Sequence, residues 1–520
     1  MSVEKEMPEN ATAIVRANRF AARIDGLVER RAWFWAAAAV CLIVAASLAD
    51  AWRRPLWYDE LNTYYVAAQP GPAAIVQATL EGCDTAPPLY AILAHPLLGV
   101  FSNDAFALRL PSILGGALMA LCAFAILKRR SSALYALAGM LAIAIACRGW
   151  ALNARCYGLV FGCTGLALLS WQFAAEGKRR RWALIGLAIG LITAIALQYY
   201  SVFLLIPLAY GELVRWWNSR KTDYPIWAIL AGAPLTLVPH LGLLRADARF
   251  AQGFYARASW ADAVYTQLEF AMWTLVGLSL ALAAYQAWSY VSKTSDTRVS
   301  GIALPPTHEI AAWTVLSLLP WIVVFVAMYT THTFVDRYAA PALVCVNLLL
   351  IVLVWWAMRG SRMLGVCLLL VFLAIFGVRY GRPLFGSYPL INAEPAKLLL
   401  AKAPTEPGPI LIPEHAVFLE LWYHQPDLRP RLVFASDPAN DSDGRVITAL
   451  SRRTDIRALD YKTFLAGTPR FLLCAAAGEW IQWDLMKRGL LLEPLDRMEK
   501  SGSAFELYEV ERRARETAAR

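Results

Sequence analysis

The sequence predicts a polytopic α-helical membrane protein with a small α/β domain at its C-terminal end. The composition is 58% hydrophobic and only 17% charged, with a mean hydropathy of +0.45. A soluble globular chain is closer to half apolar and a quarter charged. The apolar residues also stand in runs of about 17–24, long enough to cross a bilayer as helices. Short basic clusters separate these runs.

The basic clusters predict the orientation of the chain. Short loops rich in Lys and Arg face the cytoplasm in membrane proteins. Five clusters are therefore expected on the cytoplasmic side: residues 128–130, residues 178–181, Arg215 with Arg220 and Lys221, Lys293 with Arg298, and Arg359 with Arg362. Because the net charge of +10 comes from these loops, orientation in the bilayer explains it and nucleic acid is not expected as a partner.

One threading keeps all five clusters inside. It has about eleven spans, with the N-terminus in the cytoplasm and the C-terminal part outside. The predicted spans are residues 32–50, 105–127, 132–148, 157–175, 183–198, 201–217, 225–242, 269–291, 310–330, 339–357 and 363–379. The alternative makes a span of residues 88–103, which would place residues 128–130 outside. That stretch is short and has His95-Pro96 in its middle, so we expect an interfacial helix there.

The spans divide the chain into three parts. Residues 1–31 form a basic, weakly amphipathic stretch that we expect on the inner leaflet. Residues 32–379 form the transmembrane domain, whose first outer loop is residues 51–104. The first span is expected to remain as an uncleaved anchor, although it ends in Ala49-Asp50-Ala51, which resembles a signal-peptidase site.

Residues 380–520 have an ordinary composition and predict the α/β domain on the outer face. Four short apolar stretches predict strands at residues 408–413, 431–436, 470–475 and 505–510. Two amphipathic stretches predict helices at residues 414–424 and 477–489.

Two adjacent carboxylates follow the first span, in the stretch LWYDELNTYY. Asp59 and Glu60 lie among aromatic residues, which any membrane interface recruits. A solvated loop does not need two acids between Trp-Tyr and Leu, so these acids are candidates for chemistry. The alternative is that both side chains are interfacial acids that extend into water and have no catalytic role. Further along the loop, Asp84 precedes the rigid corner Pro87-Pro88 and Tyr90; the alternative reading of this corner is a helix start.

Arginines lie near the outer ends of the predicted spans. Arg109 is about one turn inside the second span, where it needs an anionic partner unless its side chain reaches the interface. Arg148 and Arg155 follow the third span, close to Tyr157, and they run against the usual excess of positive charge inside. They are therefore candidates for binding an anion.

The outer end of the tenth span has a similar group: His332, Asp336, Arg337 and Tyr338. A structural ion pair between Asp336 and Arg337 is the alternative interpretation. Taken together, one membrane face combines carboxylates with several arginines. That combination suits a general base that works beside a phosphate leaving group.

Five motifs occur in an order that resembles a known superfamily. They are WYDE, PPLY, RLPS-x-L-x-G, AR-x-Y and RY-x-x-P. The series resembles the GT-C superfamily of membrane glycosyltransferases over about residues 30–380. Within it, the chain looks like the dolichyl-phosphate-mannose–protein mannosyltransferase family and its bacterial relatives, which include aminoarabinose–lipid A transferases. The resemblance implies an enzyme of the inner membrane that takes a sugar from a polyprenyl phosphate and transfers it to a lipid, glycan or protein at the outer face.

The resemblance also implies roles for individual residues. The family's paired acids match Asp59 and Glu60, and Asp84 matches a further acid of the loop, which gives the predicted catalytic set. The predicted donor phosphate-binding residues are Arg109, Arg155, Arg337 and Tyr338, and the predicted substrate-binding residues are Tyr90, Tyr157 and His332. Asp59 is expected to deprotonate the acceptor hydroxyl, with Glu60 orienting or binding, and one displacement would invert the anomeric centre.

One motif departs from the family. The family often has Glu-Ala-Arg-x-Tyr, whereas this chain reads Asn153-Ala154-Arg155-Cys156-Tyr157. Since the Glu is missing, we predict no cofactor, and a divalent metal stays open as an alternative.

Two other classes of protein compete with the glycosyltransferase. A transporter or lipid flippase would have ionisable residues at mid-membrane and two matched half-repeats, and neither is evident in the sequence. A sensor with an extracytoplasmic ligand domain is the weaker third reading. The sequence identifies neither the sugar nor the acceptor.

Overall fold

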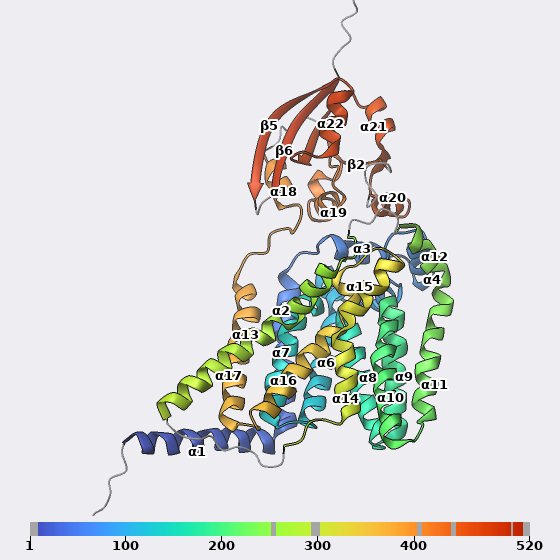
Figure 1. Cartoon of the computed structure of the whole chain (residues 1–520). Helices are drawn as coiled ribbons and strands as arrows, with labels where there is room; N and C mark the ends of the chain where they lie inside the picture. The colour runs from blue at the N-terminus through green and yellow to red at the C-terminus, as the bar shows by residue number, and fades with distance from the viewer. Residues whose placement is uncertain are drawn as a thin grey trace, which may run out of the picture. The chain divides into compact units, whose positions relative to one another are not determined.

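A computed structural model describes residues 9–250, 256–292, 302–402, 408–437, 444–500 and 503–512. The chain forms two compact units (Figure 1). The helical unit consists of Met1–Trp52, Arg109–Leu241 and Tyr255–Gly386. The mixed unit consists of Arg53–Leu108, Gly242–Phe254 and Ser387–Arg520. The mixed unit thus joins the predicted first outer loop to the C-terminal segment.

The described residues include eight helices long and apolar enough to cross a membrane, or nine if one bent pair counts as a span. The eight are α2 (Ala32–Arg53), α6 (Asp104–Lys128), α7 (Ala133–Ala151), α8 (Tyr157–Ala175), α9 (Arg180–Leu197), the continuous stretch Tyr224–Ala246, α13 (Trp260–Ser292) and α17 (Arg362–Phe385). The bent pair is α14 (Thr307–Ser317) with α15 (Leu319–Tyr329), whose axes differ by 48°. The predicted polytopic helical class is confirmed.

The remaining two predicted spans correspond to shorter helices. These are α10 (Leu205–Ser219), which follows the 3₁₀ turn η1 (Tyr199–Leu204), and α16 (Ala342–Ala357). The stretch Tyr224–Ala246 comprises α11 (Tyr224–Gly232), the 3₁₀ segment η2 (Ala233–His240) and the start of α12 (Leu241–Phe250). The count of eleven spans therefore stays a prediction, although every predicted span contains a helix.

Small residues let α6 and α8 pack closely. A methyl group added at Gly158 would lie 2.1 Å from the backbone oxygen of Ser112, and one at Gly162 would lie 2.7 Å from that of Gly115. The Ser112 hydroxyl in turn accepts a hydrogen bond of 3.1 Å from the Gly158 backbone nitrogen. Glycines four residues apart are a recurrent means of bringing two membrane helices into backbone contact.

Ion pairs connect the basic loops at one end of the helical unit. In α1 (Glu9–Arg30), Glu29 pairs with Lys128, and Asp25 lies 3.1 Å from Arg362. Figure 1 shows α1 lying across the ends of the other helices of this unit. The N-terminal stretch is thus helical from Glu9 to Arg30, and its place on a leaflet stays a prediction.

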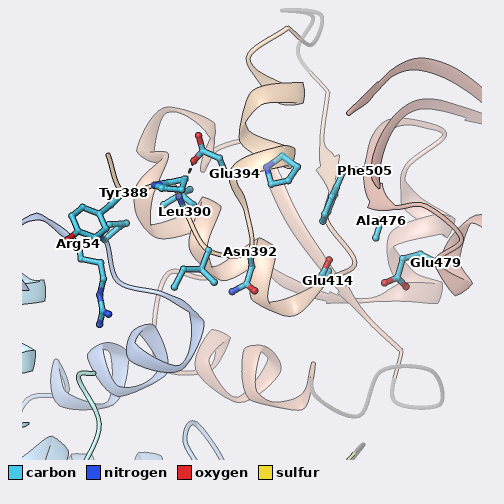
Figure 2. A pocket seen from close by; sticks show the side chains of 13 residues that line it. Arg54, Tyr388, Leu390, Asn392, Glu394, Glu414, Ala476, Glu479 and Phe505 are labelled. Carbon is cyan, nitrogen blue, oxygen red and sulfur yellow. Dashed lines mark hydrogen bonds between the residues drawn. The ribbon is translucent and has the colours of Figure 1, made fainter. Parts of the chain in front are cut away.

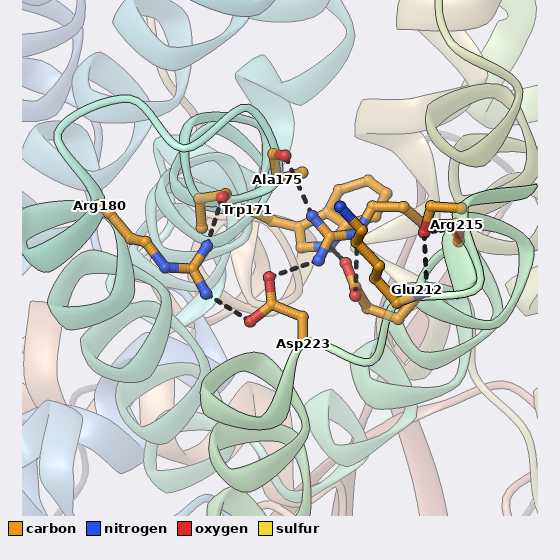
Figure 3. Close-up of polar contacts among 9 residues, drawn as sticks. Trp171, Ala175, Arg180, Glu212, Arg215 and Asp223 are labelled. Atoms are coloured by element: carbon orange, nitrogen blue, oxygen red, sulfur yellow. Dashed lines mark hydrogen bonds and ion pairs between the residues drawn. The ribbon is translucent and has the colours of Figure 1, made fainter.

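A second ionic group joins α8, α9, α10 and the start of α11 (Figure 3). Asp223 pairs with Arg215 and lies 2.5 Å from Arg180. Glu212 accepts hydrogen bonds from Trp171 at 2.6 Å and from Arg215 at 3.2 Å. The predicted cluster of Lys293 and Arg298 lies outside the described residues.

The mixed unit is built on a six-stranded sheet in the order β3-β2-β1-β4-β6-β5. Its strands are β1 (Ile410–Leu411), β2 (Leu432–Ser436), β3 (Ala458–Asp460), β4 (Arg470–Ala476), β5 (Leu490–Lys500) and β6 (Ser503–Arg512). The first four named in the sheet order run parallel, and β4-β6-β5 are antiparallel. The four predicted strands are confirmed as β1, β2, β4 and β6, whereas β3 and β5 are additional.

Helices cover this sheet. They are α18 (Glu394–Leu400), α19 (His415–His424), α20 (Arg445–Ser451), α21 (Tyr461–Gly467) and α22 (Trp480–Lys487), of which α19 and α22 were predicted. The first loop adds α3 (Tyr58–Ala67), α4 (Pro72–Leu80) and α5 (Leu89–Val100) to the same unit. The twelve-residue α5 occupies the stretch predicted as a short helix, and it is too short to span a bilayer.

Candidate active site

The two predicted acids lie in the first turn of α3, but their environments differ. Glu60 is fully buried. Its Oε2 accepts a hydrogen bond of 3.3 Å from the Trp57 backbone nitrogen, and its Oε1 lies 3.3 Å from Arg54 Nη2. Such a carboxylate satisfies a backbone donor at the helix start, as in a capping box. Asp59 is only partly buried, so it remains accessible from solvent.

Thr63 brings the third predicted acid close to the same turn. Its Oγ1 lies 3.3 Å from the backbone oxygen of Asp59 and 3.5 Å from Oδ2 of Asp84. Asp84 is buried, and its Oδ1 accepts a hydrogen bond of 3.1 Å from the Ala86 backbone nitrogen. Asp59, Glu60 and Asp84 therefore belong to one cluster within the mixed unit. Thr63 was not predicted as part of this cluster.

Tyr90 lies one turn into α5 and is buried. Its hydroxyl donates a hydrogen bond of 2.6 Å to the backbone oxygen of Leu108. This contact connects α5 to the start of α6. The predicted role of Tyr90 in binding substrate stays a prediction.

A residue that the sequence analysis missed holds the start of α3. Glu420 of α19 is fully buried. It accepts hydrogen bonds from the backbone nitrogens of Tyr58 at 3.3 Å, Asn392 at 3.0 Å and Ala393 at 3.0 Å, and from the Asn392 amide at 2.6 Å. Burial raises the pKa of this carboxyl, and the hydrogen bonds lower it in part. The available signal was a lone Glu within the apolar stretch HAVFLELWYH.

Further contacts connect α19 with the first loop. His424 Nε2 donates to the backbone oxygen of Leu56 at 2.8 Å, and the Tyr423 hydroxyl donates to Asp104 at 2.6 Å. The rings of Tyr423 and Tyr64 meet edge to face, with centroids 5.1 Å apart. The C-terminal segment thus fixes both the residues before α3 and the helix itself.

In the helical unit, three predicted residues lie near the ends of α6 and α8. Arg109 is fully buried, and its Nη1 donates to the backbone oxygen of Ala51 at 3.1 Å. Arg155 is also buried, just before α8. The Tyr157 ring meets that of Trp150 edge to face at 5.1 Å. The close crossing at Gly158 fixes the backbone beside Tyr157.

The late group forms a second cluster in the helical unit. Arg337 and Tyr338 lie in the 3₁₀ turn η3 (Asp336–Ala339). The Tyr338 ring stacks on that of Tyr200 at 4.0 Å, and the Gln198 amide donates to the Arg337 backbone oxygen at 2.6 Å. Asp336 accepts from the Arg337 backbone nitrogen at 2.7 Å, and burial raises the pKa of its carboxyl.

His332 is exposed and has a φ of +58°, a conformation that is uncommon for a residue other than glycine. Two backbone hydrogen bonds hold it, from His332 N to Ala327 O at 2.7 Å and from Ala258 N to His332 O at 3.0 Å. Strained backbone of this kind occurs often at functional sites. Its substrate-binding role stays a prediction.

These clusters define the class of chemistry. The mixed unit presents one accessible carboxylate backed by two buried acids, which suits a general base. The helical unit presents arginines and a stacked tyrosine at the ends of long apolar helices, which suits binding of a phosphate at membrane depth. The described residues contain no group of three His, Cys, Asp or Glu side chains arranged to hold a metal ion. The absence of a cofactor stays a prediction.

Comparisons with known proteins point to the same class. Residues 85–242 match the family model described as dolichyl-phosphate-mannose-protein mannosyltransferase. A search of curated proteins returns no match. Two crystal structures of ArnT from Cupriavidus metallidurans resemble this chain, one bound to undecaprenyl phosphate and one in the apo state. Their TM-scores are 0.52 and 0.53 at 11% and 12% identity, and each match covers 92% of this chain and 97% of ArnT.

The structural matches establish the fold, and the family model matches part of the chain, residues 85–242. The chain is a polytopic membrane protein with the fold of ArnT. The family match over residues 85–242 and the ArnT-like fold agree with the resemblance found in the sequence and support a membrane glycosyltransferase. These findings favour the transferase and give no support to the transporter alternative.

Proposed function

We propose that the protein transfers a monosaccharide from a polyprenyl phosphate to a lipid, glycan or protein acceptor at the outer face of the inner membrane. The family match supports a lipid-phosphate-linked donor. ArnT, whose fold this chain resembles, has been crystallised with undecaprenyl phosphate. A donor of this kind keeps its tail in the bilayer, so its sugar-phosphate ester lies at the depth of the helix ends.

The observation that carries the mechanism is the contrast between Asp59 and Glu60. Both oxygens of the buried Glu60 interact with groups at the start of α3, whereas Asp59 can be reached by an acceptor hydroxyl. Asp59 is therefore the base, which takes the proton of the hydroxyl as it attacks the anomeric carbon. Glu60 and Asp84 hold that turn in place. The C–O bond to phosphate breaks as the new glycosidic bond forms, and the anomeric centre inverts.

The leaving phosphate needs positive charge and no general acid, because its pKa is already low. We assign this role to Arg109, Arg155 and Arg337, with Tyr338. Arg109 and Arg155 are buried and Arg337 is half-buried, which supports the assignment because a guanidinium in a low dielectric attracts an oxyanion more strongly than one in water. Replacing Arg337 by Ala should strongly impair turnover while the protein still inserts, and Lys should restore turnover only in part because it lacks the planar fork.

The proposal requires Asp59 to lie outside the cytoplasm. The N-terminus is then inside and the C-terminal segment outside. Alkaline phosphatase fused after residue 400 should be active, and fused near Ser131 it should be inactive. The opposite pattern would overturn both the topology and the role of Asp59.

A deletion strain tests the reaction itself. Complementation with Asp59→Asn keeps the shape of the side chain and removes the base. Mass spectrometry of lipid extracts should then show accumulated polyprenyl-phosphate sugar and loss of the glycosylated acceptor. We expect transfer to fall by at least about a thousandfold, within the range that general-base catalysis and positioning contribute together. Glu60→Gln should reduce transfer less.

The exposed Asp427 provides a matched control. Asp427→Asn makes the same chemical change in the same unit and should leave transfer near the parental level. Near-parental transfer by Asp59→Asn would show that Asp59 is not the base, and Asp84 would become the next candidate. A comparison of glycans and lipids between deletion strain and parent would also identify the sugar and the acceptor.

A further inference from the structure

A pocket of about 560 Å³ lies within the mixed unit, and none of the predicted catalytic acids lines it (Figure 2). Its walls come from residues 54–55, from residues 388–395 before and at the start of α18, from Glu414 before α19, and from the region of β4 and β6. Its volume falls in the range of roughly 300–1,000 Å³ that small-molecule sites have. The mechanism above gives this pocket no role.

Carboxylates line one side of the pocket. Figure 2 shows Glu414 and Glu479 on the side where Phe505 and Ala476 also lie. Burial, followed by the charges of Glu479 and Glu420, raises the pKa of Glu414 to about 7. A carboxyl group that titrates near neutrality can accept a hydrogen bond from a hydroxyl or donate one to it.

Apolar and amide groups complete the walls. Phe505 and Leu390 are buried, Tyr388 is half-buried, and Asn392 adds a side-chain amide. A sugar ring has apolar C–H faces and a rim of hydroxyls, so it matches aromatic walls combined with a few polar groups. The carboxylates of Glu414, Glu479 and Glu394, the last on another wall, disfavour an anionic ligand, and a bare cation would not require aromatic walls.

Two residues of the wall are connected to the start of α3, Asn392 through Glu420 and Arg54 directly. Asn392 donates to Glu420 through its backbone at 3.0 Å and its amide at 2.6 Å, and Glu420 accepts from the Tyr58 nitrogen at 3.3 Å. Arg54 lies 3.3 Å from Glu60. A ligand in the pocket is therefore separated by one side chain from the helix that carries Asp59.

We propose that this pocket binds a sugar unit of the acceptor and thereby holds the acceptor beside α3. The assignment of the sugar to the acceptor rests on the proposed function, whereas binding of a sugar does not. The site is distinct from the acids that carry out the chemistry.

Binding can be measured on the full-length protein in lipid nanodiscs by saturation-transfer NMR and calorimetry. The probes are maltose, di-N-acetylchitobiose and glucosamine, with lysine amide as an amine that lacks a sugar ring. We expect at least one sugar to bind at least tenfold more tightly than lysine amide. Glu414→Gln and Tyr388→Ala should each weaken that sugar at least tenfold.

Glu493→Gln is the matched control, because Glu493 is exposed on β5 and does not line the pocket. It should bind like the parent. Glu414→Gln keeps the volume of the side chain, and circular dichroism will show whether Tyr388→Ala still folds. If no sugar binds more tightly than lysine amide, or if Glu414→Gln binds like the parent, the proposal is wrong.

The same protein separates this inference from the proposed function. Asp59→Asn should bind the sugar normally while transfer is lost. Active transfer without sugar binding at the pocket would overturn the pocket alone. Sugar binding in a parent protein that transfers nothing from a polyprenyl-phosphate sugar would overturn the proposed function and the assignment of the sugar to the acceptor, and binding of a sugar in the pocket would stand.

Discussion

The helical and mixed units stabilise their buried carboxylates by different means. Glu309 in the helical unit is fully buried, pairs with Arg130 and accepts a hydrogen bond of 2.8 Å from Gln172. Glu420 in the mixed unit is equally buried, but three of its four donors are backbone N–H groups. Glu309 is therefore neutralised by an opposite charge, whereas Glu420 is stabilised mainly by backbone dipoles.

This difference suits the two tasks. An ion pair between helix ends is strong in a low dielectric and leaves little net charge at the membrane boundary. Backbone donors stabilise a carboxylate without cancelling its charge, so the mixed unit keeps negative charge close to the start of α3. Glu420, which holds the start of the helix that carries the predicted base, is thus stabilised mainly by backbone donors.

The largest effect should come from a change in the packing of the helical unit. Gly158→Ala places a methyl group 2.1 Å from the backbone oxygen of Ser112, so α6 and α8 would have to move apart and lose the hydrogen bond from Gly158 N to the Ser112 hydroxyl. We expect almost complete loss of folded protein in membranes, measured by detergent extraction and size-exclusion chromatography. Overpacking of a tight contact costs more than the ~1–3 kcal/mol usual in adaptable cores.

Gly377→Ala is the control for this substitution. Gly377 lies in α17 and would place its methyl group in open space. Ala has the better helix propensity by about 1 kcal/mol, so this variant should be as stable as the parent or slightly more stable. If Gly158→Ala folds like Gly377→Ala, close packing does not determine the α6–α8 contact.

The second effect tests the mixed unit. Glu420→Ala removes the acceptor of four hydrogen bonds and leaves three backbone donors, from two segments, unsatisfied. The free energy of unfolding should fall by about 3 kcal/mol, since each buried unsatisfied group costs ~1–3 kcal/mol and water replaces some of the bonds. Thermal unfolding followed by tryptophan fluorescence will measure it.

Transfer activity gives a second readout for Glu420. At a temperature where Glu420→Ala remains folded, kcat should fall while the KM for the donor changes little, because α3 is displaced and the donor-binding arginines are not. Glu420→Gln keeps one carbonyl acceptor and should recover part of kcat. Equal kcat in all three proteins would mean that Glu420 stabilises the unit without positioning Asp59.

These residues also mark how far the sequence predicts the structure. Hydropathy and basic clusters predicted every long helix, because each of those signals is local. Four strands and two helices of the mixed unit were predicted from alternation and periodicity. By contrast, β3 has three residues and its side chains are partly or fully exposed, and β5 contains Pro494 and charged residues, so neither has the alternating pattern of a buried strand.

The residues of the candidate site also fall into two groups, those that the sequence predicted and those that it did not. Asp59, Glu60 and Asp84 were predicted from residue type and order, and the structure brings them together in one cluster through Thr63. Glu420 and Asn392 were missed because they act on Tyr58 from more than 330 residues away along the chain. Long-range partners of this kind leave no periodic or spacing signal in a single sequence.

The third effect is a dependence on pH. The pKa of Glu414 is raised from 4.5 to about 7, chiefly by burial and then by Glu479 and Glu420. A raised carboxyl pKa means that ionisation is costlier in the folded state. The cost is absent below pH 4.5 and complete above about pH 7.

Glu414→Gln removes this ionisation. Relative to the parent, the variant should gain about 2 kcal/mol of stability between pH 4.5 and pH 8, after allowance for partial exposure. Urea unfolding at both pH values measures the gain, and Glu493→Gln on the exposed face of β5 should not show it. A gain of similar size at both pH values would mean that the gain does not come from ionisation of Glu414.

The smallest effect concerns the one kind of contact that the mixed unit shares with the helical unit. Arg453 donates two hydrogen bonds of 2.6 Å to Glu81, which joins the end of α4 to the residues after α20. These bonds, followed by one from Gln77, lower the pKa of Glu81 to about 2. The contribution to stability is therefore complete above pH 4.5 and is lost as the pH falls toward 2. Because both side chains are partly exposed, solvent and salt screen the pair.

Glu81→Gln should lower the free energy of unfolding at pH 7 by less than about 1 kcal/mol, and 1 M NaCl should remove most of that difference. If it instead costs as much as Glu420→Ala, paired charges hold the first loop to the C-terminal segment, and the contrast between the two units disappears.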